Sequence, residues 1–273
     1  LTALCQSEHL SILVGSGLTH AVHCMATGKR LPGMGSADFG KSVYKDQILA
    51  EAKRSAGAAG RGEGNIEDQL RVGIDLHRGL EILSSASNAE HTEPREKLRE
   101  CLVGILETFA QSILEGEQGI TAAGEVERGE AFNYLVTFLM SFASRTGTRD
   151  RLHVFTTNYD RLLEAGADAA GLHLLDRFVG ALSPVFRSSR LDLDLHYNPP
   201  GIRGEPRYLE GVARFTKLHG SIDWIETQDA IRRVGLPFGA SEIAPFLSVG
   251  GFPVSDAFRL MIYPNAGKDR ETS

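Results

Sequence analysis

The stretch Leu10-Ser-Ile-Leu-Val-Gly-Ser-Gly-Leu-Thr19 decides the fold class of this chain. Its apolar run from Leu10 to Val14 predicts a buried strand, and Gly15 and Gly17 interrupt the run before Thr19, where a helix can begin. A strand, a glycine turn and a helix in this order are typical of nucleotide-binding α/β units, in which backbone N–H groups at a helix N-terminus receive phosphate. The third glycine of the common dinucleotide fingerprint is missing, so a plain tight turn is the alternative interpretation.

The composition is that of an ordinary globular protein, with 273 residues of which 42% are hydrophobic and 23% are charged. No apolar run approaches the roughly 18 residues that cross a bilayer, and the first residues lack the basic start and continuous apolar core of a signal peptide. The first residue is not methionine, so we expect the natural start to lie upstream. The net charge is −6 and no long basic run occurs, which argues against a nucleic-acid surface. We therefore expect a cytoplasmic protein that contacts neither a membrane nor nucleic acid directly.

The three cysteines, Cys5, Cys24 and Cys101, lie far apart and form no C-x-x-C pair. A disulfide framework is therefore not predicted, and a four-cysteine zinc ribbon is excluded within this chain. We expect a reducing compartment and no metal site.

Residues 38–146 are predicted to form a block of helices. Asn65 is the expected N-cap of one helix, in which apolar residues recur at four-residue spacing. A second helix is expected to be capped by Thr92, and a third to run from about residue 128 to residue 145. Core packing is the simplest explanation of these apolar stripes, so no chemistry is expected in them.

Strand patterns return after this block and are separated by helical segments, which argues for a mainly parallel sheet. The expected strands lie at residues 152–156, 173–179, 191–197, 213–218, 221–225 and 260–263. We predict an α/β fold in which residues 1–37 and 147–273 form a Rossmann-like domain and residues 38–146 form a helical insertion.

A polar segment, Thr156-Thr-Asn-Tyr-Asp160, lies at the carboxyl end of one predicted strand, where open α/β sheets bind ligands. The alternative interpretation is structural: Asn158 caps the following helix and Asp160 complements its dipole. That alternative accounts for the residue types but not for the two consecutive threonines before Asn158.

A second polar segment, Lys217-Leu-His-Gly-Ser221, follows another predicted strand. A histidine after an apolar run is more often a packed side chain than a ligand. At the carboxyl end of a strand, however, His219 can reach a ligand and act as a general base at neutral pH. Gly220 beside it permits a left-handed turn or a close approach of the backbone to a ligand.

Taken together, the segments G-S-G-L-T, T-T-N-Y-D and K-L-H-G-S resemble the sirtuin family in order and kind. Sirtuins carry a G-A-G-x-S loop, a T-Q-N-x-D segment and a catalytic H-G. The match spans residues 10–225 and rests on about fifteen positions, so each motif is weak and the ordered set of three is fairly specific. The resemblance implies a Rossmann-like domain that binds NAD+.

The resemblance also implies roles for individual residues. Asn158 and His219 would be catalytic, with His219 acting as a base near the ribose hydroxyls. The implied cofactor-binding residues are Gly15, Ser16, Gly17, Thr19, Thr157, Asp160, Gly220 and Ser221. Among these, the glycine loop and Thr19 would hold the pyrophosphate, and Asp160 would act with Asn158 at the nicotinamide ribose and carboxamide.

The departures from the sirtuin pattern bear on the reaction. Sirtuin deacylases build their acyl-lysine cleft with a zinc ribbon, and the predicted helical block stands in the corresponding place here. Tyr159 replaces a small aliphatic residue, and Thr157 replaces a glutamine. The chain is therefore more similar to the sirtuin-like domains of bacterial anti-phage systems, in which His-Gly-Ser-Ile-Asp-Trp-type sequences are familiar. Those domains hydrolyse NAD+ to nicotinamide and ADP-ribose and so deplete it during infection.

Three other functions stay open at this point. The first is protein deacylation or ADP-ribosyl transfer, of which the deacylation is disfavoured by the missing zinc ribbon. The second is a non-catalytic sensor of NAD+ or ADP-ribose, and the third is a nucleotide-binding α/β domain of another role. The resemblance implies a homo-oligomer, or a partner such as a HerA-type ATPase or an Argonaute-type protein, and no residue selects between them.

Overall fold

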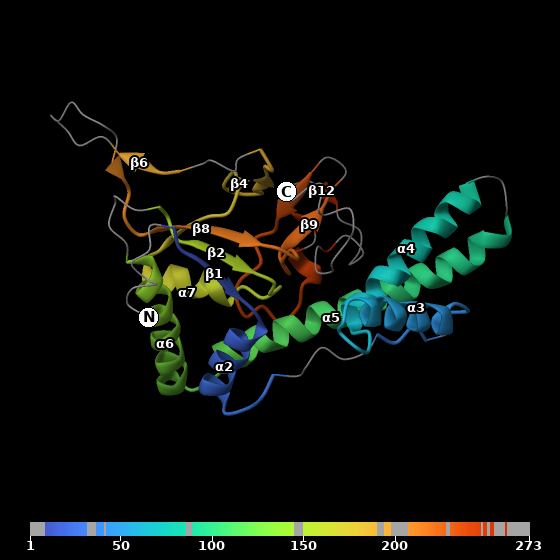
Figure 1. Ribbon diagram of the computed structural model, residues 1–273, viewed down its shortest axis with the longest axis horizontal. Coiled ribbons are helices and arrows are strands. Elements are labelled where there is room, and N and C mark those ends of the chain that lie inside the picture. Colours follow the sequence, from blue (N-terminus) through green and yellow to red (C-terminus); the bar gives the residue numbers. More distant parts are fainter. Residues whose placement is uncertain are drawn as a thin grey trace.

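The computed structural model describes residues 9–31, 37–40, 42–85, 89–144, 150–189, 194–197, 207–227, 230–246, 248–249, 252–253 and 260. These residues form a mixed α/β fold with a parallel sheet (Figure 1). Some of its helices pack on the sheet, and the others form an arm that extends away from it. The predicted α/β class is therefore confirmed.

The described part of the main sheet contains four parallel strands in the order β1-β2-β8-β3. Their bounds are Ser11–Val14 for β1, His153–Thr156 for β2, Val212–Lys217 for β8 and His173–Leu175 for β3. Val14 pairs with Thr156, and Thr156 pairs with Lys217, so β1, β2 and β8 end level with one another. The three polar segments of the sequence follow these three strands and therefore begin at the same edge of the sheet.

Three helices pack on the sheet: α2 (Ser16–Thr27), α6 (Glu125–Ala143) and α7 (Leu162–Ala170). α6 contacts both α2 and α7. The first helix begins at Ser16, directly after Gly15, and not at Thr19 as the sequence suggested. The apolar core that these helices share with the sheet includes Val22, Ala26, Ile120, Leu135, Leu139, Val154, Leu163 and Phe215.

The arm consists of α3 (Lys45–Ala58), α4 (Ile66–Ser85) and α5 (Thr92–Thr121). Asn65 caps α4 as predicted, because its Oδ1 accepts the Asp68 N–H at 3.0 Å while Asp68 Oδ2 accepts the Asn65 N–H at 3.2 Å. Thr92 is the first helical residue of α5 and not its cap. With 30 residues, α5 is long enough to run from the tip of the arm back to the sheet, where it contacts α2 (Figure 1).

Two large hydrophobic cores run through the described residues. α6 and the last turns of α5 belong to the core of the sheet. The second core joins the arm to segments that follow β2 and β8, and it includes Phe39, Leu70, Leu102, Leu106, Tyr159, Ile222 and Leu236. Because both parts of the predicted Rossmann-like domain share cores with residues 38–146, the helical block packs as an integral part of the fold.

The remaining elements are short. A small antiparallel sheet has the order β4-β5-β10-β9, with bounds Phe178–Val179, Val185–Phe186, Ile231–Arg233 and Trp224–Glu226. Two strand pairs join β6 (His196–Tyr197) to β7 (Arg207–Tyr208) and β11 (Ser248–Val249) to β12 (Phe252–Pro253), and the 3-10 turns are η1 (Ala89–His91) and η2 (Ala244–Phe246). The expected strand at 173–179 is thus split into β3 and β4. Parts of the expected strands at 191–197 and 260–263 lie outside the described residues, although Leu260 bridges to Ile225.

Candidate functional site

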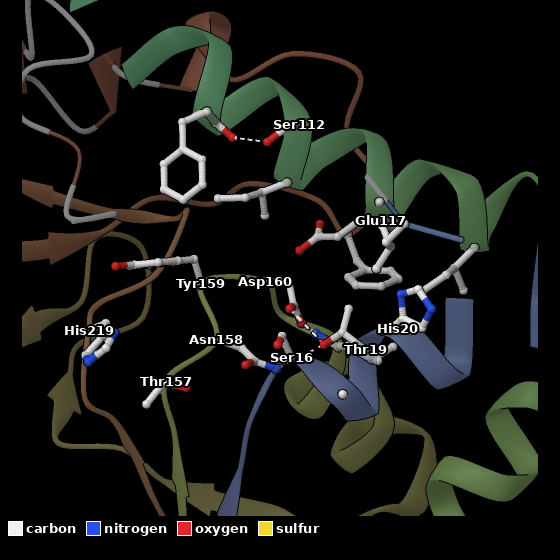
Figure 2. Close-up of a pocket in the computed structure, with 18 of the residues that line it drawn as sticks. Ser16, Thr19, His20, Ser112, Glu117, Thr157, Asn158, Tyr159, Asp160 and His219 are labelled. Atoms are coloured by element: carbon white, nitrogen blue, oxygen red, sulfur yellow. Dashed lines mark hydrogen bonds between the residues drawn. The ribbon is translucent and has the colours of Figure 1, made fainter. Parts of the chain in front are cut away.

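A cavity of about 520 Å³ lies where β1, β2 and β8 end, and α5 forms its opposite wall (Figure 2). Its volume is in the range of small-molecule sites, which is roughly 300 to 1,000 Å³. Most of the predicted site residues line it: Ser16, Gly17, Thr19, Thr157, Asn158, Asp160 and His219. The topology therefore brings together residues from all three polar segments of the sequence.

The N-terminus of α2 forms one side of this cavity. Ser16 and Gly17 are its first residues and both line the cavity. Among the described residues, no side chain caps this helix and no acidic residue lies in its first turn. A helix N-terminus presents unsatisfied N–H groups and a partial positive charge, and these bind anions such as phosphate. The geometry that the glycine turn predicted is therefore present.

The two glycines of this turn leave open space beside the backbone. Gly15 has an extended conformation with φ of −109°, which any residue can adopt. A Cβ atom built on Gly15 or on Gly17 would meet no described atom within 4 Å. Neither backbone strain nor packing within the described chain therefore demands glycine here. The bare backbone instead leaves room for a ligand to approach the start of α2.

A chain of hydrogen bonds orients the Asn158 side chain. Thr19 Oγ1 donates to Asp160 Oδ2 at 2.9 Å, and it accepts from Asn158 Nδ2 at 3.0 Å. The direction is fixed because a carboxylate can only accept, so the Thr19 oxygen is the acceptor for the amide N–H. The Asn158 Oδ1 atom is consequently turned away from Thr19, on the side where Figure 2 shows Thr157 and His219.

The structural alternative for Asn158 is wrong. α7 begins at Leu162, and the Leu162 N–H donates to Asp160 Oδ1 at 3.0 Å. Asp160 therefore supplies the capping oxygen, whereas the Asn158 side chain bonds to Thr19. α7 therefore makes no use of the Asn158 amide, which Thr19 holds instead.

His219 lies on the short connection after β8, and its side chain is 34% exposed. Its Nδ1 lies 3.8 Å from Glu67 Oε1, which comes from the first turn of α4. The same Glu67 oxygen accepts a hydrogen bond from the Tyr159 hydroxyl at 2.7 Å. Burial acts to raise the pKa of Glu67, but the neighbouring His219 and Tyr159 side chains outweigh it and bring that pKa below its ordinary value. Glu67 is therefore a carboxylate facing the histidine.

Three predicted site residues do not line the cavity: Gly15, Gly220 and Ser221. Gly15 precedes α2 and shapes the turn. Gly220 has φ of +93°, a conformation that favours glycine, so its role is to turn the chain after His219. Ser221 is fully buried, and its Oγ donates to the Tyr159 carbonyl at 3.3 Å. It supports the wall of the cavity from behind.

A buried lysine ties the segments after β2 and β8 together. Lys217 Nζ donates to the Asp160 carbonyl at 2.5 Å, to Glu164 Oε1 at 2.8 Å and to Ser221 Oγ at 2.9 Å. Its three N–H groups are thereby all used, and its side chain is 1% exposed. The contact therefore links the segment that contains His219 to the segment that contains Asn158.

The α5 wall of the cavity includes a carboxylate, Glu117, that the sequence analysis did not single out. Glu117 lines the cavity, and its Oε2 and Oε1 accept from Arg161 Nη2 at 2.5 Å and Arg161 N at 2.9 Å. Arg161 also donates to the carbonyl oxygens of Leu236 and Pro237. This buried pair joins α5 to the turn after β2 and to the segment after β10. The sequence around Glu117 does not indicate a functional site, because Glu117 lies on α5, whose pattern of apolar residues is accounted for by packing in the core.

Within the residues that the structure describes, no group of three His, Cys, Asp or Glu side chains is placed to hold a metal ion. Over the same residues, no helix combines the length and apolar character needed to cross a membrane. No protein-family model and no curated protein matches this chain.

Proposed function

We propose that this protein is a sirtuin-like NAD+ hydrolase that cleaves NAD+ to nicotinamide and ADP-ribose. One observation carries the proposal: a single cavity combines the uncapped start of α2 with an oriented Asn158 amide and the His219 imidazole. The first of these features suits a pyrophosphate, and the other two suit chemistry at a ribose. A site that only bound the dinucleotide would not require the Asn158 and His219 pair.

Cleavage of NAD+ requires few catalytic groups in the site. The nicotinamide of NAD+ is a cationic leaving group, so it departs with the electrons of the C1′–N bond and needs no general acid. The transition state resembles an oxocarbenium ion, which the site stabilises with oriented dipoles. Water then bonds to C1′ and loses a proton.

The described residues can perform these steps. The Asn158 Oδ1 atom accepts a hydrogen bond from the attacking water or from a ribose hydroxyl, because Thr19 holds the opposite end of the amide. His219 accepts the proton that the water loses. The N-terminus of α2 holds the pyrophosphate and keeps the ribose between these two groups.

The proposed biological role follows from the resemblance of the three polar segments to sirtuin-like domains of bacterial anti-phage systems. We propose that the hydrolase depletes NAD+ in anti-phage defence, as a homo-oligomer or with a HerA-type ATPase or an Argonaute-type partner. An unregulated hydrolase would be toxic to its host, so a repressed state is expected. The predicted helical insertion would then replace the zinc-ribbon domain of sirtuins.

A chromatographic product assay tests the proposed reaction. Purified protein, alone and with each candidate partner, should convert NAD+ to equal amounts of nicotinamide and ADP-ribose. Nicotinamide release with ADP-ribose attached to protein would instead identify a transferase. Binding of NAD+ without any nicotinamide release under all these conditions would overturn the hydrolase and favour a sensor.

A substitution of Thr19 tests how Asn158 is oriented. Thr19→Val keeps the shape of the side chain but removes the hydroxyl that links Asn158 to Asp160. We expect kcat for NAD+ cleavage to fall about 10- to 100-fold with a nearly unchanged KM, because the amide loses its fixed orientation in the transition state. Thr19→Ser retains the hydroxyl and is the matched control, expected to keep most of the activity. Equal loss in both variants would contradict this role.

A further inference from the structure

The helical arm contributes a carboxylate to the proposed site. Glu67 lies beside Asp68 in the first turn of α4, where an acidic residue complements the helix dipole. In the structure its side chain lines the cavity and is only 13% exposed. A buried carboxylate is costly unless it is paired, so its partners indicate what it does.

Two side chains of the polar segments face this carboxylate. The Tyr159 hydroxyl donates to Glu67 Oε1 at 2.7 Å, and His219 Nδ1 lies 3.8 Å from the same oxygen. The ring of Tyr159 packs edge-on against Phe109 at 5.6 Å between centroids, which fixes the phenol from the α5 side. Tyr159 thus supports the Glu67 oxygen that lies nearest to His219.

We propose that Glu67 is a positioning residue that holds His219 in the tautomer with the proton on Nδ1, an inference that rests on the proposed function. A carboxylate only accepts hydrogen bonds, so the imidazole nitrogen that faces it is the one that carries hydrogen. The lone pair then lies on Nε2, which can accept a proton as a general base. The distance of 3.8 Å is longer than a hydrogen bond, but such contacts in catalytic pairs commonly tighten when substrate binds.

The Glu67 carboxylate also stabilises the protonated His219 that forms when the imidazole takes the proton from water. When His219 takes a proton from water, its new positive charge forms beside the Glu67 carboxylate. Glu67 is suited to this because its pKa lies below the ordinary value, despite the burial that acts to raise it, so it is charged at neutral pH. Tyr159 departs from the sirtuin pattern. Its contact with Glu67 explains why a tyrosine is useful at this position, because its hydroxyl bonds to the carboxylate.

The first experiment separates positioning from structure by kinetics. Glu67→Gln keeps the size of the side chain and can still accept from Tyr159, but it removes the charge that faces His219. We expect kcat for NAD+ cleavage to fall about 10- to 100-fold with KM within about threefold. Tyr159→Phe removes only the supporting hydroxyl and should cost much less. Glu63→Gln, an exposed glutamate paired with Lys53, should change nothing.

The second experiment reads the tautomer directly and needs no activity. Long-range ¹H–¹⁵N spectra of protein labelled at histidine, recorded at alkaline pH where imidazole is neutral, distinguish Nδ1–H from Nε2–H rings. The His219 signals are identified by their loss in His219→Asn. Wild-type protein and Tyr159→Phe should show the Nδ1–H form, and Glu67→Gln should shift the ring toward the Nε2–H form.

The outcomes separate the two proposals. A wild-type Nε2–H ring would overturn the role of Glu67 even if no variant could be purified. An active enzyme in which Glu67→Gln leaves both kcat and the tautomer unchanged would also overturn it. If the wild type shows the Nδ1–H ring but releases no nicotinamide, the positioning contact stands and the proposed hydrolase fails.

Discussion

Replacing His219 by alanine should lower the rate of NAD+ cleavage by about 100- to 10,000-fold, the range that a general base contributes. The loss should fall on kcat, because the imidazole acts on the proton of the attacking water. The side chain is one-third exposed, so its removal should leave the thermal unfolding temperature nearly unchanged. The measurement is the initial rate of nicotinamide release, with imidazole added to the variant as a chemical rescue.

Matched histidine and asparagine variants control this result. His9 lies just before β1, away from the cavity, and its exposed imidazole bonds to Asp150. His9→Ala should therefore keep full activity. Asn158→Ala should lose about 100- to 1,000-fold in kcat, as expected for a group that stabilises developing charge. Asn133→Ala, on an exposed position of α6, should lose none. Wild-type rates in His219→Ala would remove the histidine from the proposed mechanism.

Replacing Lys217 by methionine should lower the free energy of unfolding by about 3 to 5 kcal/mol, because it leaves a half-buried carboxylate without its partner. Lys217 bonds to the Asp160 carbonyl, Glu164 and Ser221 at the same time. Its loss should also lower NAD+ cleavage, since the connections that carry Asn158 and His219 would no longer be joined. Urea unfolding monitored by circular dichroism measures the first effect, with an unchanged m value as the check on two-state behaviour.

Two further variants test why Lys217→Met should lower the free energy of unfolding. Glu164→Leu combined with Lys217→Met removes both charges and should recover part of the stability, because no half-buried carboxylate then lacks a partner. Lys53→Met breaks an exposed pair with Glu63 and should leave the unfolding midpoint nearly unchanged. A loss of less than about 1 kcal/mol in Lys217→Met would show that the lysine does not hold the site together.

Much of the site could be predicted because its signals are local. An apolar run followed by glycine or by a polar cluster is visible in any single segment, and all three segments proved to follow parallel strands. The cap on α4 was equally readable, because Asn65 and Asp68 satisfy each other within one turn. The sequence left open whether Asn158 caps α7, since Asn158 and Asp160 are both capping types and only the path of the backbone chooses between them.

The sequence by itself determined the α/β class with its parallel strands β1, β2 and β8, and the chemical types at the carboxyl ends of these strands. These depend on backbone propensities and on side-chain periods that a short window contains. The tertiary structure decided the strand order that brings Val14, Thr156 and Lys217 level, the inward or outward direction of each polar side chain, and the cavity wall that α5 supplies. It also decided that Glu67 faces His219. Such contacts arise from the packing of two hydrophobic cores along distant parts of the chain, and no local pattern encodes which side chains that packing will bring together.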